Sequence, residues 1–267
     1  MEFSLAGAQE SLLKDCHTNF VRTFESVANG IPGGKIERVE GVSIVSPGLP
    51  GFDMVFALDL PGSLKRVSEA IERNYGDTTR WSLVTTQETS EAFTPLIREL
   101  GLEKVRDEPG MVLDPIPDWY TLLPRDLVIH RVTEQEEMRA FVKAGGMFGM
   151  AIETLEPLAD TVASGIRNGT FRGGCYLGYH SGRPVATSMR CTFGMIAGVY
   201  FVTTLPEFRN RGIGGAMTWR AAVDGKREEG CVASFLQASD MGRPVYERMG
   251  YRIIVNYQVW RKQAAKS

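Results

Sequence analysis

Segments in which apolar side chains recur with the period of a helix alternate along the chain with segments that have the pattern of a strand. This alternation of helices and strands predicts a mixed α/β fold. In the first half, apolar side chains recur at helical spacing and glycines follow them. These patterns predict helices at residues 8–28, 64–75 and 93–100. Stretches rich in β-branched and aromatic side chains predict strands at residues 36–45, 53–60, 81–86 and 111–113.

The second half repeats the alternation. Strands are predicted at residues 127–129, 175–179, 185–193, 195–203, 231–236 and 251–260. A capping box formed by Thr133 and Glu136 predicts a helix after it. A buried helix is expected between Gly215 and Gly230, and Ser239 or Asp240 caps a short helix that ends at Gly250.

A proline-dense stretch at residues 114–120 separates the two halves. We place a domain boundary there, which gives domains at residues 1–120 and 121–267. The fold class expected is α/β (α+β) with a mixed sheet, in which some strands are parallel and others antiparallel. Each half is expected to form a twisted mixed sheet flanked by helices.

The two halves also align with each other. Residues 81–102 match residues 230–251 without gaps, strand on strand and helix on helix. A second alignment, shifted by four residues, places Val67 on Gly212 and Glu69 on Gly214. The first half therefore resembles a degenerate copy of the second, and we expect only the second half to bind a cofactor.

Composition narrows the function classes. The chain has 267 residues, 43% of them hydrophobic and 23% charged, with a net charge of −2. This balance is typical of a soluble globular protein and gives no indication of nucleic-acid binding. No run of 18 apolar residues exists, and the N-terminus lacks the pattern of a signal peptide. We therefore expect no membrane partner and a cytoplasmic location.

Cysteine and histidine usage argues against a metal site. The four cysteines are Cys16, Cys175, Cys191 and Cys231, and the three histidines are His17, His130 and His180. None of them stands at metal-ligand spacing from another. Free, buried thiols in a reducing cytoplasm are expected, with no metal.

The most informative stretch is residues 202–216, where a strand ends at a proline turn and a glycine-studded segment enters a helix. Such a unit presents free backbone N–H groups and the positive end of a helix dipole at one point, which favours an anion such as phosphate. The nucleoside-triphosphate loop requires Lys-Ser/Thr after its last glycine, and Ala216-Met217 follows here. The dinucleotide pattern requires a small residue at Met217, so both motifs fail.

The pattern that fits is Arg-x-x-Gly-x-Gly, with Arg209, Gly212 and Gly214. It resembles the pyrophosphate-binding motif of the GNAT superfamily of acetyl-CoA-dependent N-acetyltransferases. The resemblance implies that backbone amides of this loop hold the pyrophosphate of coenzyme A and that the preceding strand bonds the pantetheine through its backbone. The implied cofactor-binding residues are Val202, Thr204, Arg209, Asn210, Arg211, Gly212, Ile213, Gly214, Gly215 and Ser239.

A second motif supports the resemblance. Residues 239–251 are similar to the last GNAT motif, which has a polar residue, usually Asn, then a tyrosine seven residues later and a Gly-Phe or Gly-Tyr pair. Tyr246 and Gly250-Tyr251 match, while the shorter Ser239 stands at the Asn position. Tyrosine has an ordinary pKa near 10 and can donate a proton to the leaving thiolate. The resemblance thus implies Tyr246 as general acid, and the alternative is a packing aromatic.

No general base is assigned from the sequence. The acidic residues of the irregular region 145–174 and two strand residues are candidates, and a water chain is an alternative. These candidates are Glu153, Glu156, Asp160, His180 and Tyr200.

Together these features predict an N-acetyltransferase that moves an acetyl group from acetyl-CoA to a primary amine by direct attack. The alternative is a non-catalytic acyl-CoA-binding regulatory or sensor protein, which Ser239 at the Asn position suggests. A structural alternative gives the first half a role in dimerisation or in shaping the substrate site. A small-molecule amine is favoured over a protein as acceptor, and the chain is expected to be a monomer or homodimer.

Overall fold

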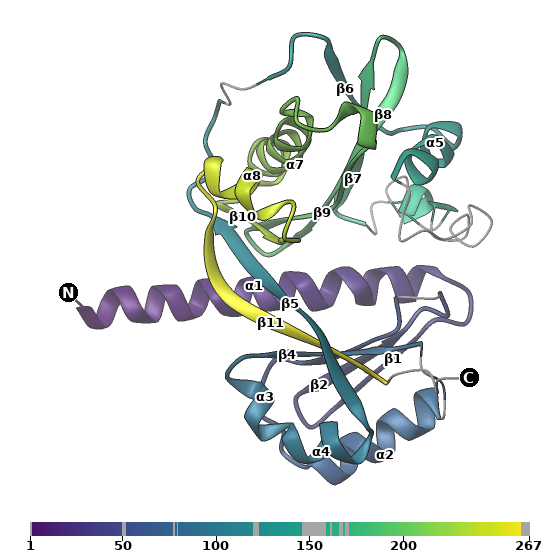
Figure 1. The fold of residues 1–267 in the computed structure, drawn as a ribbon, viewed down its shortest axis with the longest axis vertical. Helices are drawn as coiled ribbons and strands as arrows, with labels where there is room; N and C mark the ends of the chain where they lie inside the picture. Colours follow the sequence, from purple (N-terminus) through teal and green to yellow (C-terminus); the bar gives the residue numbers. More distant parts are fainter. Residues whose placement is uncertain are drawn as a thin grey trace. The chain divides into compact units, whose positions relative to one another are not determined.

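The computed structural model describes residues 2–49, 52–76, 78, 80–119, 123–145, 159–160, 162–165, 168 and 171–262, with the backbone alone for residues 2–6. The helices labelled in Figure 1 are α1 (Glu2–Gly30), α2 (Leu64–Tyr75), α3 (Thr89–Ala92), α4 (Thr94–Glu99), α5 (Gln135–Gly145), α7 (Ile213–Glu229) and α8 (Arg243–Arg248). A 3₁₀ turn, η2, covers Pro206–Phe208.

The strands are β1 (Lys35–Val39), β2 (Val42–Ser46), β3 (Met54–Ala57), β4 (Ser82–Thr86), β5 (Leu102–Leu113), β6 (Leu127–Arg131), β7 (Gly173–His180), β8 (Arg183–Phe193), β9 (Ile196–Thr204), β10 (Ala233–Gln237) and β11 (Arg252–Lys262). Among the described residues they follow one another in a single mixed sheet of 11 strands, in the order β1-β2-β3-β4-β11-β5-β10-β9-β8-β7-β6. The mixed α/β class is confirmed, whereas the separate sheet predicted for each half is not found.

The chain divides into two compact units that are not contiguous in sequence. Unit 1 comprises residues 1–20 and 111–254, and unit 2 comprises residues 21–110 and 255–267. Each unit therefore takes one terminal segment from the opposite half of the chain. The domains expected at residues 1–120 and 121–267 stay a prediction.

In unit 1 the sheet is covered on both faces. Residues 185–192 of β8 are all buried, which requires cover on each side because successive side chains point to opposite faces. Helix α7 packs against β8 and β9, and α5 packs against the same strands from the other side (Figure 1). The core on the α7 side includes Met111 and Leu113, which belong to the last three residues of β5 and to unit 1.

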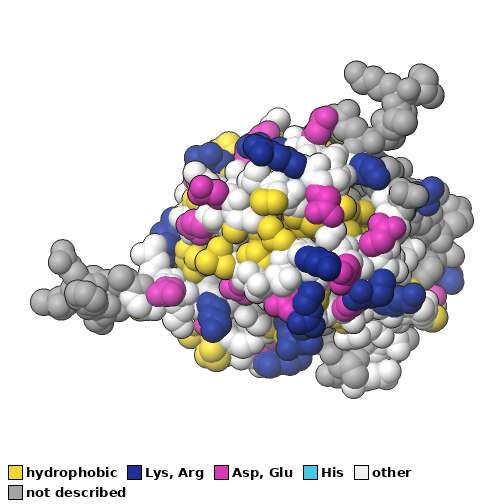
Figure 2. All heavy atoms as spheres, turned by 90° about the horizontal axis from the view of Figure 1, so that it is seen from below, with side chains coloured by type: hydrophobic (Ala, Val, Ile, Leu, Met, Phe, Trp, Pro, Cys, Tyr) yellow, Lys and Arg dark blue, Asp and Glu magenta, His cyan; other side chains and the backbone are white. Residues whose placement is uncertain are grey.

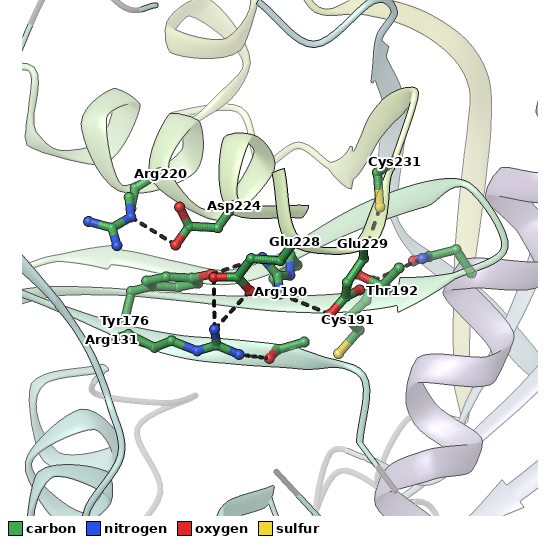
Figure 3. A network of polar contacts seen from close by, with 12 residues as sticks. Arg131, Tyr176, Arg190, Cys191, Thr192, Arg220, Asp224, Glu228, Glu229 and Cys231 are labelled. Carbon is green, nitrogen blue, oxygen red and sulfur yellow. Dashed lines mark hydrogen bonds and ion pairs between the residues drawn. The ribbon is translucent and has the colours of Figure 1, made fainter. Parts of the chain in front are cut away.

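A partly buried ionic network joins the C-terminal end of α7 to the sheet (Figure 3). The side chain of Arg190 on β8 is fully buried and donates to Glu228 at 2.9 Å and to Glu229 at 3.0 Å. Arg131 on β6 pairs with Glu228 at 2.8 Å. Burial alone would raise the pKa of Glu228, but the hydrogen bond from Arg190 and the charge of Arg131 outweigh it and lower this pKa. The network thus fixes the position of α7 along its axis.

The first helix contributes a side chain to unit 1. Asn19 is fully buried, and its amide donates to the carbonyl oxygens of Cys191 and Ile196 at 3.0 and 3.1 Å. The hydroxyl of Tyr200 donates to its Oδ1 at 2.7 Å. A side chain on Gly198 would collide with Oδ1, since an added Cβ would lie 2.0 Å from it. Asn19 of α1 is therefore fixed to the β8–β9 hairpin by three hydrogen bonds.

Unit 2 repeats part of this order. Strands β3 and β4 are parallel with α2 between them, just as β9 and β10 are parallel with α7 between them. Its core is apolar and centred on these elements. On the face shown in Figure 2, basic and acidic side chains are interspersed around a band of apolar ones. Tandem duplication stays a prediction.

Three local predictions were wrong. Residues 36–45 are a hairpin rather than one strand, because Glu40 and Gly41 adopt φ of 51° and 83° in the turn between β1 and β2. Strand β5 is far longer than residues 111–113. The carboxylate that caps α5 is Glu137, whose Oε2 accepts from the amide of Thr133 at 2.9 Å, and not that of Glu136.

The expectation of free, buried cysteines agrees with the structure. All four cysteines are buried and free. Within the described residues, no three His, Cys, Asp or Glu side chains gather as a metal ion would require. Nor does any helix in that part of the chain have the length and apolar character needed to cross a membrane.

Candidate functional site

The glycine-rich segment forms a turn that leaves helix amides unpaired. After η2, Asn210 and Gly212 both take left-handed conformations, with φ of 62° and 75°. The first amide within α7 that finds an acceptor is that of Ala216, which donates to Gly212 O at 3.1 Å. The amides of residues 213–215 precede it and have no helical partner. They point out of the helix N-terminus and form a cradle suited to an anion.

Glycine at position 214 keeps this cradle open. A Cβ built there would lie 3.7 Å from Thr204 Oγ1, which places the end of β9 directly beside the first turn of α7. Gly212 needs its left-handed φ to begin the helix, and no side chain caps that end. The absence of a side-chain cap leaves the amides available to a ligand.

Strand β9 separates from β10 on its way to the cradle. The parallel pairing runs from Ala233↔Ile196 to Phe235↔Gly198 and stops there. Farther along, β9 carries an extra residue relative to β8, since Met189 pairs with Tyr200 but Thr187 pairs with Thr203. Phe201 sits in this bulge with φ of 52°. A bulge bends and twists its strand, which accounts for a gap between β9 and β10.

A cavity of about 820 Å³ opens at this point. Every cofactor-binding residue that the sequence predicts lines it, and so does Tyr246. The predicted residues in its wall are Val202, Thr204, Arg209, Asn210, Arg211, Gly212, Ile213, Gly214, Gly215 and Ser239. The sequence did not indicate the apolar part of the wall, which Leu123, Met241 and Val245 provide.

The charged side chains described in the cavity wall are all positive. Arg209, Arg211 and Arg248 line the cavity, and no carboxylate does among the described lining residues. Arg209 donates to Thr204 O at 3.1 Å, and Arg211 donates to Glu207 O at 3.1 Å while its guanidinium lies 5.2 Å from the centre of the Phe208 ring. These contacts hold two cations beside the cradle and favour an anionic ligand.

Tyr246 lies on α8 and packs closely within the wall. Its ring centroid is 5.8 Å from that of Tyr251, and a Cβ on Gly242 would lie 2.9 Å from its Cε2. Burial raises the pKa of Tyr246 to about 12, and a hydrogen bond with Thr218 acts in the opposite direction. The phenol is therefore protonated throughout the physiological pH range.

Ser239 has a local structural partner. Its Oγ accepts from the amide of Gly242 at 3.1 Å, which stabilises the turn into α8. This bond accounts for one lone pair of the hydroxyl and leaves its proton available. Ser239 lines the cavity and caps a turn at the same time.

The candidates for a general base have different surroundings. Tyr200 is buried and donates to Asn19, while the ring of the half-buried His180 packs 5.2 Å from that of Phe208. Asp160 is exposed and accepts from Gln135 at 2.9 Å. Glu153 and Glu156 lie outside the described residues. The structure does not bring Tyr200, His180 or Asp160 into the cavity wall.

Unit 2 has the same elements without the cradle. Strands β3 and β4 stay paired from Met54↔Ser82 to Ala57↔Thr85, so no gap opens between them. At the N-terminus of α2 the side chain of Ser63 accepts from Arg66 N, and the carboxylate of Glu40 pairs with the Arg66 side chain. The N-terminus of α2 thus has a side-chain cap, which the N-terminus of α7 does not have.

Comparisons with known proteins find similarity in structure but none in sequence profile. No protein-family profile and no curated protein matches the sequence. A GCN5-related N-acetyltransferase from Kribbella flavida matches the structure with a TM-score of 0.67 and 18% identity, covering 94% of this chain and 96% of that one. A tandem GNAT protein from the clavulanic acid biosynthesis pathway matches with a TM-score of 0.59 and 15% identity, covering 88% and 86%.

A functionally unknown conserved protein from Staphylococcus epidermidis has a TM-score of 0.57 at 17% identity, covering 87% of this chain and 95% of that one. At such identities the similarity shows the fold. The chain has the mixed α/β fold of GCN5-related N-acetyltransferases over most of its length, and the structural resemblance expected from the two motifs is confirmed.

Proposed function

We propose that the protein is a cytoplasmic acetyl-CoA-dependent N-acetyltransferase whose acceptor is a primary amine. The observation that carries the proposal is the cavity at the N-terminus of α7, with its unpaired amides, its arginines and Tyr246 in one wall. A volume of about 820 Å³ is suited to a ligand of the size of coenzyme A.

The coenzyme would bind along the line from α7 to the β9–β10 gap. The amides of residues 213–215 would hold the pyrophosphate, with Arg209 and Arg211 beside it. The backbone of Val202 and Thr204 would bond the pantetheine as a neighbouring strand does, because β10 has left this part of β9. Asn210 and Gly212 provide the left-handed turn, and the Ser239 hydroxyl would donate its proton to the pantetheine.

The proposed reaction forms one bond and breaks another. The neutral amine attacks the thioester carbonyl, a C–N bond forms, and the C–S bond then breaks to release a thiolate. Tyr246 would donate its proton to that thiolate, and the amine nitrogen loses its proton to water or another base. A pKa of about 12 suits this role, since Tyr246 is protonated when the acceptor amine is neutral. The thioester itself supplies the activated acetyl group.

Unit 2 would not bind the coenzyme. Its strands stay paired and its α2 terminus is capped internally, so we expect one coenzyme per chain. A small-molecule amine is the acceptor we favour, on the weak net charge of −2.

A second function has one observation in its favour. Ser239 stands where the GNAT motif usually has Asn, and its oxygen is engaged by the Gly242 amide. A weaker hold on the pantetheine would suit a protein that binds acyl-CoA without turning it over. Such a sensor would retain its acyl-CoA intact when amines are added.

The decisive experiment is an acetyl-CoA turnover screen across a panel of amines, amino acids, aminoglycosides and lysine peptides, read as release of free thiol. We expect amine-dependent release from the wild type with at least one acceptor. Tyr246→Phe should lower kcat on the order of 100-fold with little change in acetyl-CoA affinity. Tight acetyl-CoA binding without release on any amine would favour the sensor.

A further inference from the structure

A buried side chain of β8 is bonded to the bulge of β9. Between the pairs Met189↔Tyr200 and Thr187↔Thr203, β9 has one residue more than β8, and Phe201 in this bulge has φ of 52°. Thr187 is fully buried, and its Oγ1 donates to the carbonyl oxygen of Phe201 at 2.9 Å. The bulge is thus tied to the neighbouring strand by a side chain.

This bond offsets two costs of the bulge. A bulge interrupts the regular ladder of backbone hydrogen bonds, and a positive φ is strained for a residue other than glycine. A backbone carbonyl withdrawn from water needs a donor, which the Thr187 hydroxyl supplies to Phe201. The bond therefore stabilises the bulge in the conformation observed.

The same bond sets the direction of one peptide group. In a planar trans peptide, the C=O of one residue and the N–H of the next point in opposite directions. Because the carbonyl of Phe201 is turned toward Thr187 on β8, the N–H of Val202 points away from β8. On that side of β9 lies β10, whose pairing with β9 ends at Phe235↔Gly198. The N–H of Val202, a residue of the cavity wall, is thus directed at the gap.

We propose that Thr187 is a positioning residue of the coenzyme site, which holds the bulge of β9 so that the N–H of Val202 faces the pantetheine. This inference rests on the proposed coenzyme site and adds to it a residue of β8 that neither sequence motif contains. Thr187 acts through the backbone of β9, since the described wall of the cavity does not include it.

Binding of acetyl-CoA to Thr187 variants tests the proposal. Thr187→Val keeps the shape of the side chain and removes the donor, and we expect a Kd for acetyl-CoA weaker on the order of ten-fold. Thr187→Ser keeps a hydroxyl and should recover most of the affinity. Thr187→Ala replaces the valine variant if that variant does not fold. Calorimetry gives each Kd, and circular dichroism gives the folded fraction at which the proteins are compared.

A shorter ligand shows which part of the coenzyme site is affected. ADP has a pyrophosphate for the cradle but no pantetheine, so its Kd should be the same for the wild type and Thr187→Val. A loss of stability of the whole fold would not distinguish the two ligands.

Thr89→Val is the matched control in unit 2. Thr89 is also buried, and its Oγ1 donates to the carbonyl oxygen of Ala57 at the end of β3, at 2.8 Å. The same substitution therefore removes a similar bond from a strand that stays paired with its parallel neighbour. We expect it to lower the stability of the fold and to leave the Kd of the folded protein for acetyl-CoA unchanged.

Three results would overturn the role of Thr187: wild-type affinity for acetyl-CoA in Thr187→Val, no recovery in Thr187→Ser, or equal weakening of ADP and acetyl-CoA. A wild type that binds no acetyl-CoA would overturn the proposed coenzyme site instead. A wild type that binds acetyl-CoA but acetylates no amine would overturn the proposed reaction alone, because the binding measurements do not depend on turnover.

Discussion

Replacing Gly214 by alanine should separate stability from coenzyme binding. The added Cβ would meet Thr204 Oγ1 at 3.7 Å, an ordinary contact, so the folded backbone need not move. Alanine is favoured over glycine in a helix by about 0.5–1 kcal/mol, and the end position argues for the lower value. We therefore expect Gly214→Ala to be as stable as the wild type or about 0.5 kcal/mol more stable.

The same methyl group should impair binding. It would stand where a phosphate must approach the amides of residues 213–215, and loss of one charge-assisted hydrogen bond costs about 1.5–3 kcal/mol. This corresponds to a Kd for acetyl-CoA roughly ten- to hundred-fold weaker. Isothermal titration calorimetry gives the Kd, and urea unfolding followed by circular dichroism gives the free energy of unfolding.

Gly225→Ala is the control on the same helix. A Cβ there would lie 2.7 Å from Ala197 Cβ and 3.1 Å from Arg190 Cδ, so it overpacks the core far from the cradle. We expect it to destabilise the fold by about 1–3 kcal/mol and to leave the Kd of the folded protein unchanged. Wild-type affinity in Gly214→Ala would refute the cradle as the phosphate site.

Three further predictions concern the network, the pH profile and the chain ends. The double variant Glu228→Gln/Glu229→Gln leaves the buried Arg190 without a carboxylate, and urea unfolding should show a free energy of unfolding lower by about 3–5 kcal/mol. Because the pKa of Glu228 is lowered in the folded protein, its ionised form contributes stability that is lost as the pH falls below 4.5. Because the pKa of Tyr246 is about 12, kcat/KM should rise as the amine deprotonates and show no descending limb up to about pH 11, and such a limb near pH 9 would count against Tyr246. Deletion of residues 1–120 should abolish cooperative thermal unfolding of the remainder, since those residues include part of unit 1.

That last prediction follows from contacts that no local pattern could reveal. Asn19 bonds to the β8–β9 hairpin more than 170 positions away in sequence. Met111, Leu113 and Ile116 belong to the core around α7. A proline-dense segment indicated a boundary near residue 120, but the exchange of strands between the halves depends on non-local pairing. Local periodicity contains no information on such pairing.

The cradle was predictable because its constraints are local. Gly212 must be left-handed to start α7, and Gly214 must be small beside β9, so the glycine spacing follows directly from the backbone geometry. The hairpin at Glu40 was missed because a non-glycine residue takes the positive φ.

The central claim is that this chain moves an acetyl group to an amine from a coenzyme held at α7. The most direct test is a single reaction of wild-type protein with carbon-13 acetyl-CoA and the best amine of the panel, quantified by mass spectrometry. We predict acetylated amine and free coenzyme A in equal amounts, with both reduced on the order of 100-fold in Tyr246→Phe. Free coenzyme A without acetylated amine, or neither product with any amine, would contradict the claim.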